Sequence, residues 1–256
     1  MTELALVARQ LRYTNRAFWR NPASAFFTFA FPLMFLVIFT GIFGNDTITT
    51  FGREVNQSTR YIPMIGAFAI ITACYTNVAI TVAFLRDQGV LKRTRGTPMP
   101  AWGYLSARII HSVLVAVLLV LIVGAFGALF YNADIPTRTV PALIATIAVG
   151  AAAFCALGLA ITAVIPNADA APAVVNFSIL PLLFISDVFI PISNPNAWYV
   201  TVAKVFPVYH FSKALISAYF LPQGSGWQGG DLLVVAAWGV AGLLLAVRFF
   251  SWEPRQ

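Results

Sequence analysis

The sequence predicts an all-α membrane protein with six transmembrane helices, and three observations support that fold class. Hydrophobic residues make up 59% of the 256 residues and charged residues only 10%, whereas a soluble domain usually has about 25% charged residues. Apolar segments recur along the chain, each close to the roughly 20 residues that cross about 30 Å of hydrocarbon. Because these segments and their connections occupy the whole sequence, we expect a single membrane domain over residues 1–256.

Residues 1–22 are too polar to span a membrane and predict a helix lying in its interface. One side of the helical wheel is apolar and carries Leu4, Val7, Leu11 and Phe18. The opposite side is a stripe of arginines, Arg9, Arg12, Arg16 and Arg20. Such a helix rests on membrane lipids with its basic side toward phosphates and water. A signal peptide is the alternative, but no short apolar stretch with a small-residue cleavage site follows, and Pro22 should end the helix.

Six apolar segments predict the membrane spans: residues 24–43, 61–85, 105–130, 140–165, 170–187 and 232–250. The second is polar on both faces, which favours a position inside a helix bundle or at a subunit interface. Its Asn77 is expected to hydrogen-bond another helix in preference to contacting substrate. In the fourth span, Gly150 and Gly158 should allow close helix packing. A polar loop is expected over residues 44–60.

Ionisable residues and cysteines narrow the functional classes. The middles of the predicted spans hold no Asp, Glu, Lys or Arg, which counts against an ion-coupled secondary transporter. Cys74 and Cys155 are predicted to be buried free thiols, and no metal-type Cys/His spacing is present. A membrane-embedded enzyme would need a cluster of acid, base or metal ligands, whereas His111 and His210 are far apart in the sequence. Asp187, at a span end, is expected to be solvated, with a substrate contact or a local ion pair as the alternatives.

Residues 188–230 do not have the pattern of a simple loop. Apolar and aromatic residues recur at helical spacing on both sides of Pro207, in two stretches that are each too short to span. We expect two short helices that dip into the bilayer edge on the external side and return, with their aromatic residues at headgroup depth.

Basic residues are distributed unevenly between the two sides of the predicted bundle. Eleven of the 16 Lys and Arg residues fall in the N-terminal helix, between Arg86 and Arg108, or near the C-terminus. The other five fall in the connections on the opposite side. The positive-inside rule therefore places both termini and the loop over residues 86–100 in the cytoplasm.

The order of these features resembles the permease subunit of type-2 ABC exporters, and most closely the bacterial drug and antibiotic exporters of the daunorubicin-resistance type. The second cytoplasmic segment of that family carries charged residues, Gly-x-Leu, a basic residue and Thr-Pro. Here these are Arg86, Asp87, Gly89, Leu91, Lys92, Arg93, Thr97 and Pro98. The family's two Phe-Pro elements are matched by residues 189–191 and residues 206–207. The chain departs from the common pattern at Gln88, where an acid is frequent, and at Asp187, where glycine is frequent.

The resemblance implies the membrane subunit of an ATP-driven exporter in the bacterial plasma membrane. No GxxxxGK[ST] motif is present, so the chain is expected not to be an enzyme and to bind no cofactor. Two copies of a separate ABC ATPase subunit would bind ATP and Mg, and a second permease copy or a related chain would complete the membrane core. No nucleic acid partner is expected. Substrates would be amphipathic or lipidic, drug- or antibiotic-like molecules that pass near Asn77, Thr81, Asn176 and Phe184. A type-2 ABC exporter of lipid-linked polysaccharide is the alternative within the family.

Residues 86–100 are expected to receive the motion of the ATPase through a short helix at about residues 89–95. Leu91 is the largest apolar side chain there, among basic neighbours. We expect it to be exposed and to anchor in a pocket of the ATPase, because a few buried contacts usually dominate an interface. Lys92 and Arg93 should matter less, because charges at an interface rim mainly tune association rates. The alternative is that Leu91 packs back on the membrane surface.

Overall fold

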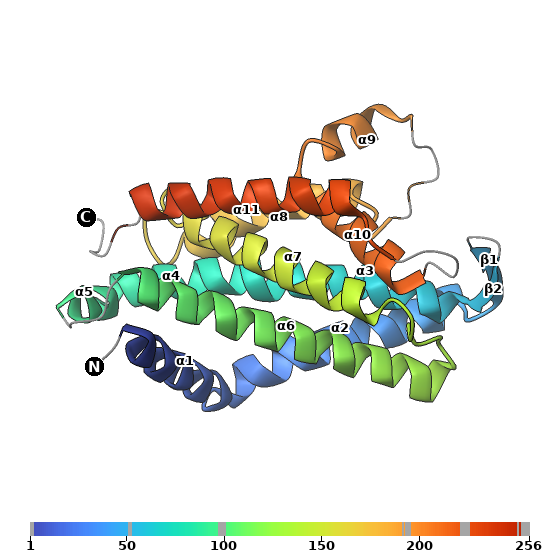
Figure 1. Cartoon of the computed structure of the whole chain (residues 1–256), viewed down its shortest axis with the longest axis horizontal. Helices are drawn as coiled ribbons and strands as arrows, with labels where there is room; N and C mark the ends of the chain where they lie inside the picture. The colour runs from blue at the N-terminus through green and yellow to red at the C-terminus, as the bar shows by residue number, and fades with distance from the viewer. Residues whose placement is uncertain are drawn as a thin grey trace.

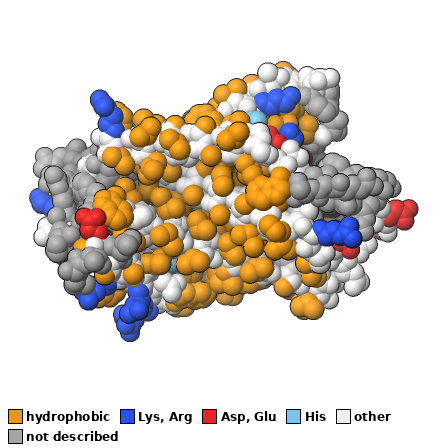
Figure 2. Space-filling model, in the orientation of Figure 1, with side chains coloured by type: hydrophobic (Ala, Val, Ile, Leu, Met, Phe, Trp, Pro, Cys, Tyr) orange, Lys and Arg blue, Asp and Glu red, His pale blue; other side chains and the backbone are white. Residues whose placement is uncertain are grey.

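In the computed structural model the helices lie side by side in an elongated bundle (Figure 1). The structure describes residues 3–50, 53–96, 101–190, 192, 196–220, 226–249 and 251. The start of α1 (Glu3–Trp19), the end of α11 (Gly229–Phe249) and the short helix α5 (Val90–Arg95) lie at one end, called here the terminal end. The strands β1 (Thr47–Thr50) and β2 (Arg53–Asn56) lie at the opposite end. On the face shown in Figure 2, hydrophobic side chains cover the middle of the bundle and charged side chains gather toward its ends.

Among the described residues, five helices are long and apolar enough to cross a membrane. Four of them are α2 (Pro22–Phe43), α6 (Ala101–Tyr131), α7 (Val140–Ile161) and α11. The fifth is one continuous helix with three segments: α3 (Gln57–Ile71), the π-helix η1 (Thr72–Thr76) and α4 (Asn77–Asp87). Helices of spanning length and composition thus occupy five of the six predicted spans. The helix in the remaining predicted span, residues 170–187, is α8 (Ala171–Ile185), which has only 15 residues. At 1.5 Å per residue that is about 22 Å, less than the hydrocarbon core, so the count of six spans stays a prediction.

The N-terminal helix α1 is amphipathic, as predicted, and lies against α6 and α2. Val7 is buried. The ring of Phe18 lies 5.4 Å from the ring of His111 on α6 and 6.3 Å from that of Phe29 on α2. The arginines of the other side are exposed, namely Arg9, Arg12, Arg16 and Arg20. The apolar side of α1 therefore packs on the bundle, and contact of its basic side with lipid headgroups stays a prediction.

The predicted polar loop over residues 44–60 contains a two-stranded antiparallel hairpin, which the all-α prediction missed. Ile48 of β1 pairs with Val55 of β2, and Val55 is buried. The side-chain amide of Asn45 donates a hydrogen bond to the carbonyl of Tyr131, at the end of α6, with an N–O distance of 2.9 Å. A two-stranded hairpin alone is at best marginally stable in water, so this packing against the end of the bundle is what supports it.

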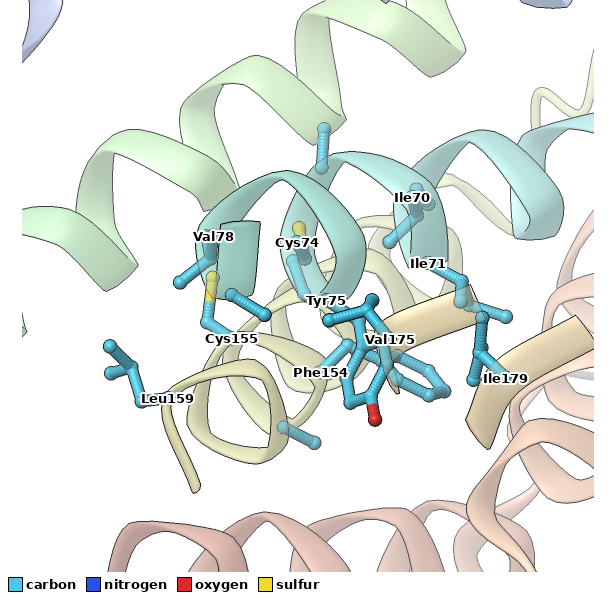
Figure 3. Close-up of a cluster of buried hydrophobic side chains, with 14 of the residues drawn as sticks. Ile70, Ile71, Cys74, Tyr75, Val78, Phe154, Cys155, Leu159, Val175 and Ile179 are labelled. Atoms are coloured by element: carbon cyan, nitrogen blue, oxygen red, sulfur yellow. The ribbon is translucent and has the colours of Figure 1, made fainter. Parts of the chain in front are cut away.

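The α3 part of the continuous helix α3–η1–α4 is surrounded by protein, whereas η1 and α4 are only partly buried. Residues 61–71 are all buried, and α2, α6, α7 and α10 (Pro207–Phe220) pack around α3. For α3 this agrees with the predicted position inside a helix bundle, whereas polar residues of η1 and α4 such as Thr72 and Asn77 are half-buried, and a subunit interface there stays a prediction. Cys74 on η1 and Cys155 on α7 are buried free thiols, also as predicted. Figure 3 shows both within a cluster of buried side chains contributed by α3, η1, α4, α7 and α8.

Two short helices, α9 (Trp198–Ala203) and α10, occur within residues 188–230, as predicted. α10 packs among α3, α7 and α11, and its Phe211 is fully buried. The ring centroids of Phe211 and Phe154 on α7 lie 5.3 Å apart, and Gly150 leaves the space that the Phe211 ring fills. α10 is thus part of the protein core, which the sequence did not predict. The position of the helix pair relative to a bilayer stays a prediction.

Gly158 should not tolerate a larger residue, because α7 packs there against the backbone of η1. A Cβ atom at this position would lie 2.7 Å from the carbonyl oxygen of Tyr75. We expect Gly158→Ala to lower the free energy of unfolding by about 1–3 kcal/mol, measured by chemical denaturation of the purified protein in detergent. The matched control is Gly41→Ala on α2, where a Cβ would have no atom within 4 Å. Equal effects of the two substitutions would contradict the close contact.

Candidate functional site

At the terminal end, α4 turns into α5 through Gly89. α4 ends at Asp87, and the N–H of Gly89 donates to the carbonyl of Arg86 at 2.9 Å. Gly89 has a φ angle of 69°, a left-handed conformation that costs a residue with a Cβ roughly 1–2 kcal/mol. α5 then begins at Val90. The short helix predicted over residues 89–95 is therefore confirmed, and glycine is needed at the turn that precedes it.

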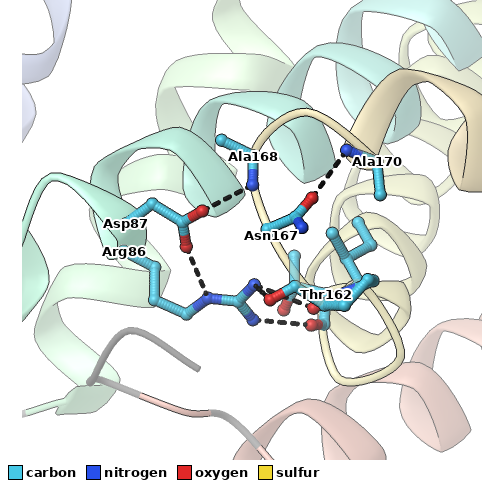
Figure 4. A network of polar contacts seen from close by, with 8 residues as sticks. Arg86, Asp87, Thr162, Asn167, Ala168 and Ala170 are labelled. Carbon is cyan, nitrogen blue, oxygen red and sulfur yellow. Dashed lines mark hydrogen bonds and ion pairs between the residues drawn. The ribbon is translucent and has the colours of Figure 1, made fainter. Parts of the chain in front are cut away.

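Arg86, in the last turn of α4, binds the turn between α7 and α8. Its side chain is almost fully buried, at 1% exposure. Nη1 donates to the carbonyl of Thr162 at 3.0 Å, and Nη2 donates to the carbonyls of Ile165 and Pro166 at 2.8 and 3.3 Å (Figure 4). The last carbonyls of a helix have no partner within it and carry partial negative charge. A buried guanidinium is therefore well matched to the cap of α7 at Thr162, and it also binds two carbonyls of the turn beyond.

Asp87 completes the contact between α4 and this turn. Its Oδ1 lies 3.5 Å from Nε of Arg86, and its Oδ2 accepts the N–H of Ala168. Within the turn, Oδ1 of Asn167 accepts the N–H of Ala170 at 2.9 Å, just before α8 begins. An ion pair away from water stabilises a fold only when its other donors and acceptors are also bound. Here backbone groups bind Nη1 and Nη2 of Arg86 and Oδ2 of Asp87, while Nε and Oδ1 face only each other. We call these two residues and their contacts the Arg86–Asp87 clamp.

Leu91 is fully buried, so the prediction that it is an exposed anchor for a partner is wrong. It belongs to the same cluster of buried apolar side chains as residues of α4 and α6. The physical reason is that α5 folds back at the glycine turn and places its apolar side on its own chain. Lys92 and Arg93 are exposed. Thr97 and Pro98, which were predicted to belong to the same contact, lie outside the described residues.

A cavity of about 380 Å³ lies between α1, α4 and α6. Asn77 and Thr81, two residues of the predicted substrate path, line it. The hydroxyl of Thr81 donates to Oδ1 of Asn77 at 3.0 Å. Asn77 was expected to hydrogen-bond another helix, but this hydrogen bond joins two residues of the same helix, α4. Asn176 and Phe184 are exposed on α8 and do not line this cavity, so the structure does not bring the four residues together.

Asp187 is a turn residue, not the solvated edge residue that was expected. Its φ angle is 60°. Its Oδ1 accepts the N–H of Ile192 at 2.9 Å, and its carbonyl accepts the hydroxyl of Ser212 on α10 at 3.3 Å. Partial burial beyond the end of α8 raises the pKa of its carboxyl, and the hydrogen bond from Ile192 opposes that rise. These contacts stabilise the turn that leads away from α8.

Asp231, at the start of α11, is the centre of a polar cluster that sequence reasoning missed. Its Oδ1 lies 2.6 Å from Nδ1 of His210, and its Oδ2 lies 3.1 Å from Nζ of Lys213. His210 and Lys213 are three positions apart and therefore share a face of α10, but nothing in the sequence pairs that face with Asp231. The cluster ties α10 to α11. Within the described residues, no group of three or more His, Cys, Asp or Glu side chains could hold a metal ion.

Comparison with known proteins assigns the family. Residues 4–220 match the model of the ABC-2 type transporter family. The chain belongs to this family. A protein from Pyropia yezoensis described as "Putative transport permease ycf38" is 26% identical over 229 residues, which cover 86% of this chain and 75% of that protein. Membership makes the chain an ABC-type transport permease and implies an ABC ATPase as its partner in general. The clamp, α5 and the cavity of this ABC-2 permease all lie within the matched residues.

The Arg86–Asp87 clamp should contribute strongly to the stability of the ABC-2 permease. We expect Arg86→Gln to lower the free energy of unfolding by about 3 kcal/mol, because carbonyls at the end of α7 lose a charged donor and Asp87 loses its counter-charge. Chemical denaturation in detergent measures the difference. Arg93→Gln removes the same charge from an exposed position of α5 and should change stability by no more than about 0.5 kcal/mol. If the two variants unfolded alike, the clamp would not be a main contact.

Proposed function

We propose that this ABC-2 permease exports amphipathic or lipidic small molecules, drug- or antibiotic-like, out of the cytoplasm or the inner leaflet of a bacterial plasma membrane. A separate ABC ATPase, in two copies, would bind ATP and Mg and supply the energy. The observation that carries the proposal is the placement of α5, which presents Lys92 and Arg93 to solvent at the terminal end while Leu91 fixes it to the bundle. A docked ATPase would therefore push on a helix that is joined to the membrane core.

Motion of α5 would reach two membrane helices. Because Leu91 is buried and Gly89 makes a tight turn, α5 is held on the end of α4. Arg86 and Asp87 bind backbone groups of the turn between α7 and α8, so α4 is held to that turn. The proposed mechanism is that ATP-driven closure of the ATPase subunits displaces α5, and that α4 and the α7–α8 turn follow it.

The substrate path is proposed to be completed by a second permease copy or a related chain. The cavity that holds Asn77 and Thr81 has both polar and apolar walls, which favours amphipathic molecules. α8 exposes apolar side chains such as Phe177 and Phe184, so a neighbouring permease chain could cover it. Export of a lipid-linked polysaccharide is the second candidate within the family. An ion-coupled transporter would respond to an ion gradient and not to ATP, and reconstituted vesicles distinguish the two.

The orientation of the bundle can be tested with single cysteines, since both native thiols are buried. Glu54→Cys on β2 and Arg93→Cys on α5 both replace exposed residues, at opposite ends of the molecule. If both termini are cytoplasmic, an impermeant thiol reagent added to intact cells should label the cysteine at position 54 and not the one at position 93. Permeabilised cells should label both. The reverse pattern in intact cells would invert the proposed topology.

Docking of the ATPase at α5 can be tested by charge reversal at Lys92 and Arg93. Because like charges placed opposite each other cost several kcal/mol, the double variant Lys92→Glu with Arg93→Glu should weaken co-purification of the ATPase by about tenfold or more. Substrate-stimulated ATP hydrolysis should fall with it, while the melting temperature of the permease stays near that of the parent. Arg138→Glu, an exposed position at the opposite end, is the control. Unchanged ATPase binding by the double variant would place the contact elsewhere.

A further inference from the structure

The cavity beside α1 contains a cationic group that no residue of the cavity wall neutralises. Arg108 and His111, both on α6, line the cavity together with Asn77 and Thr81. No acidic side chain is among the lining residues that the structure describes. Nε of Arg108 and Nε2 of His111 are buried, and neither has a hydrogen-bond partner in the described part of the chain. His111 itself is 8% exposed.

Arg108 as a whole is half-buried, and its buried, unpartnered Nε is unfavourable without a ligand. Buried charges are normally paired, because removing a charge from water without compensation is costly. Ionisable groups inside membrane helices accordingly mark a binding function by default. Arg108 has neither an ion pair nor a hydrogen bond among the described residues. An anion in the cavity would supply both the counter-charge and the missing acceptors.

A second, apolar cavity borders the first, and the two share lining residues. It has a volume of about 260 Å³ and is lined by α2 and the α3–η1 segment, with Phe27, Phe31 and Phe68 on its walls. Ala73 and Asn77 line both cavities, so the cationic space and the apolar space meet at η1. An anionic head next to an apolar tail is the chemistry of a phospholipid. Basic pockets between membrane helices on the cytoplasmic side are known to bind such headgroups.

We propose that this ABC-2 permease binds an anionic membrane phospholipid with its phosphate at Arg108 and His111 and the start of an acyl chain in the apolar cavity at η1. α1 forms the outer wall of the headgroup site through Tyr13 and Phe18, so the bound lipid would also hold α1 against the bundle. This assignment rests on the two cavities and the unpaired cation, and it places the lipid in the same cavity as Asn77 and Thr81, which the proposed substrate path also uses.

The test uses the full-length permease, stripped of lipid in a neutral detergent. Phosphatidylglycerol should remain bound in native mass spectrometry and raise the melting temperature, whereas phosphatidylcholine with the same acyl chains should do neither. Glycerol phosphate and inorganic phosphate, which lack the tail, should not stabilise the protein at the same concentration. Equal effects of the two lipids would overturn the anionic headgroup site. Equal effects of inorganic phosphate and phosphatidylglycerol would show a soluble-anion site and overturn the lipid assignment.

Variants separate the two halves of the site. Arg108→Gln should weaken phosphatidylglycerol binding by about tenfold, the effect of one charged hydrogen bond, while Arg108→Lys should retain most of it. Arg248→Gln, an exposed arginine at the same end of the bundle, is the control and should bind as the parent does. Ala73→Leu would fill the junction between the cavities and should weaken lipid binding with Arg108 intact. Parental affinity in both Arg108→Gln and Ala73→Leu would refute the proposal.

Discussion

The central helix α3–η1–α4 is the element on which the other helices depend, because it must satisfy its polar groups without water where α2, α6, α7, α8 and α10 pack against it. In a membrane core each unsatisfied polar group costs several kcal/mol. Thr81 binds Asn77 within the helix, and the hydroxyl of Tyr75 lies 2.7 Å from that of Ser178 on α8. Gly158 lets the backbone of α7 approach η1 directly. The helix can therefore carry polar residues and remain the centre of an apolar bundle.

The Arg86–Asp87 clamp extends the same principle to the terminal end. Arg86 is among the largest fully buried side chains of the described structure, which would be unfavourable if it faced apolar neighbours. One partner is the carbonyl of Thr162, which caps α7, where a helix has free acceptors and partial negative charge. The other two are the carbonyls of Ile165 and Pro166 in the turn that follows. A leucine at this position would leave those carbonyls without donors. The pairing thus satisfies two buried groups that would each be unfavourable alone, and it fixes where α7 turns into α8.

Most of the architecture was predictable because apolar segments of spanning length and a basic amphipathic helix are local patterns. The position of α2 and the burial of Cys74 follow from them, whereas the short helix α5 was expected from the family resemblance. The hairpin was missed because Ile48 and Val55 give too short an alternation to stand out in a polar stretch. The partners of Arg86 could not be predicted, because they are backbone carbonyls and any residue type supplies them. The error over Leu91 has a similar source. A single leucine among basic residues has no periodicity, so the sequence alone could not say whether it faced a partner or its own chain.

The π-helix η1 joins two parts of the central helix with different surroundings. On one side α3 is buried by α2, α6, α7 and α10, and on the other α4 borders the cavity and ends at the clamp. A π-helical turn interrupts the regular hydrogen bonding of an α-helix, and such turns are frequent at functional sites. α4 is linked to the start of α8 through the clamp, and η1 to its middle through Tyr75 and Ser178. A displacement that begins at α5 would therefore carry α4 and α8 together, with η1 as the place where the helix adjusts while α3 stays packed.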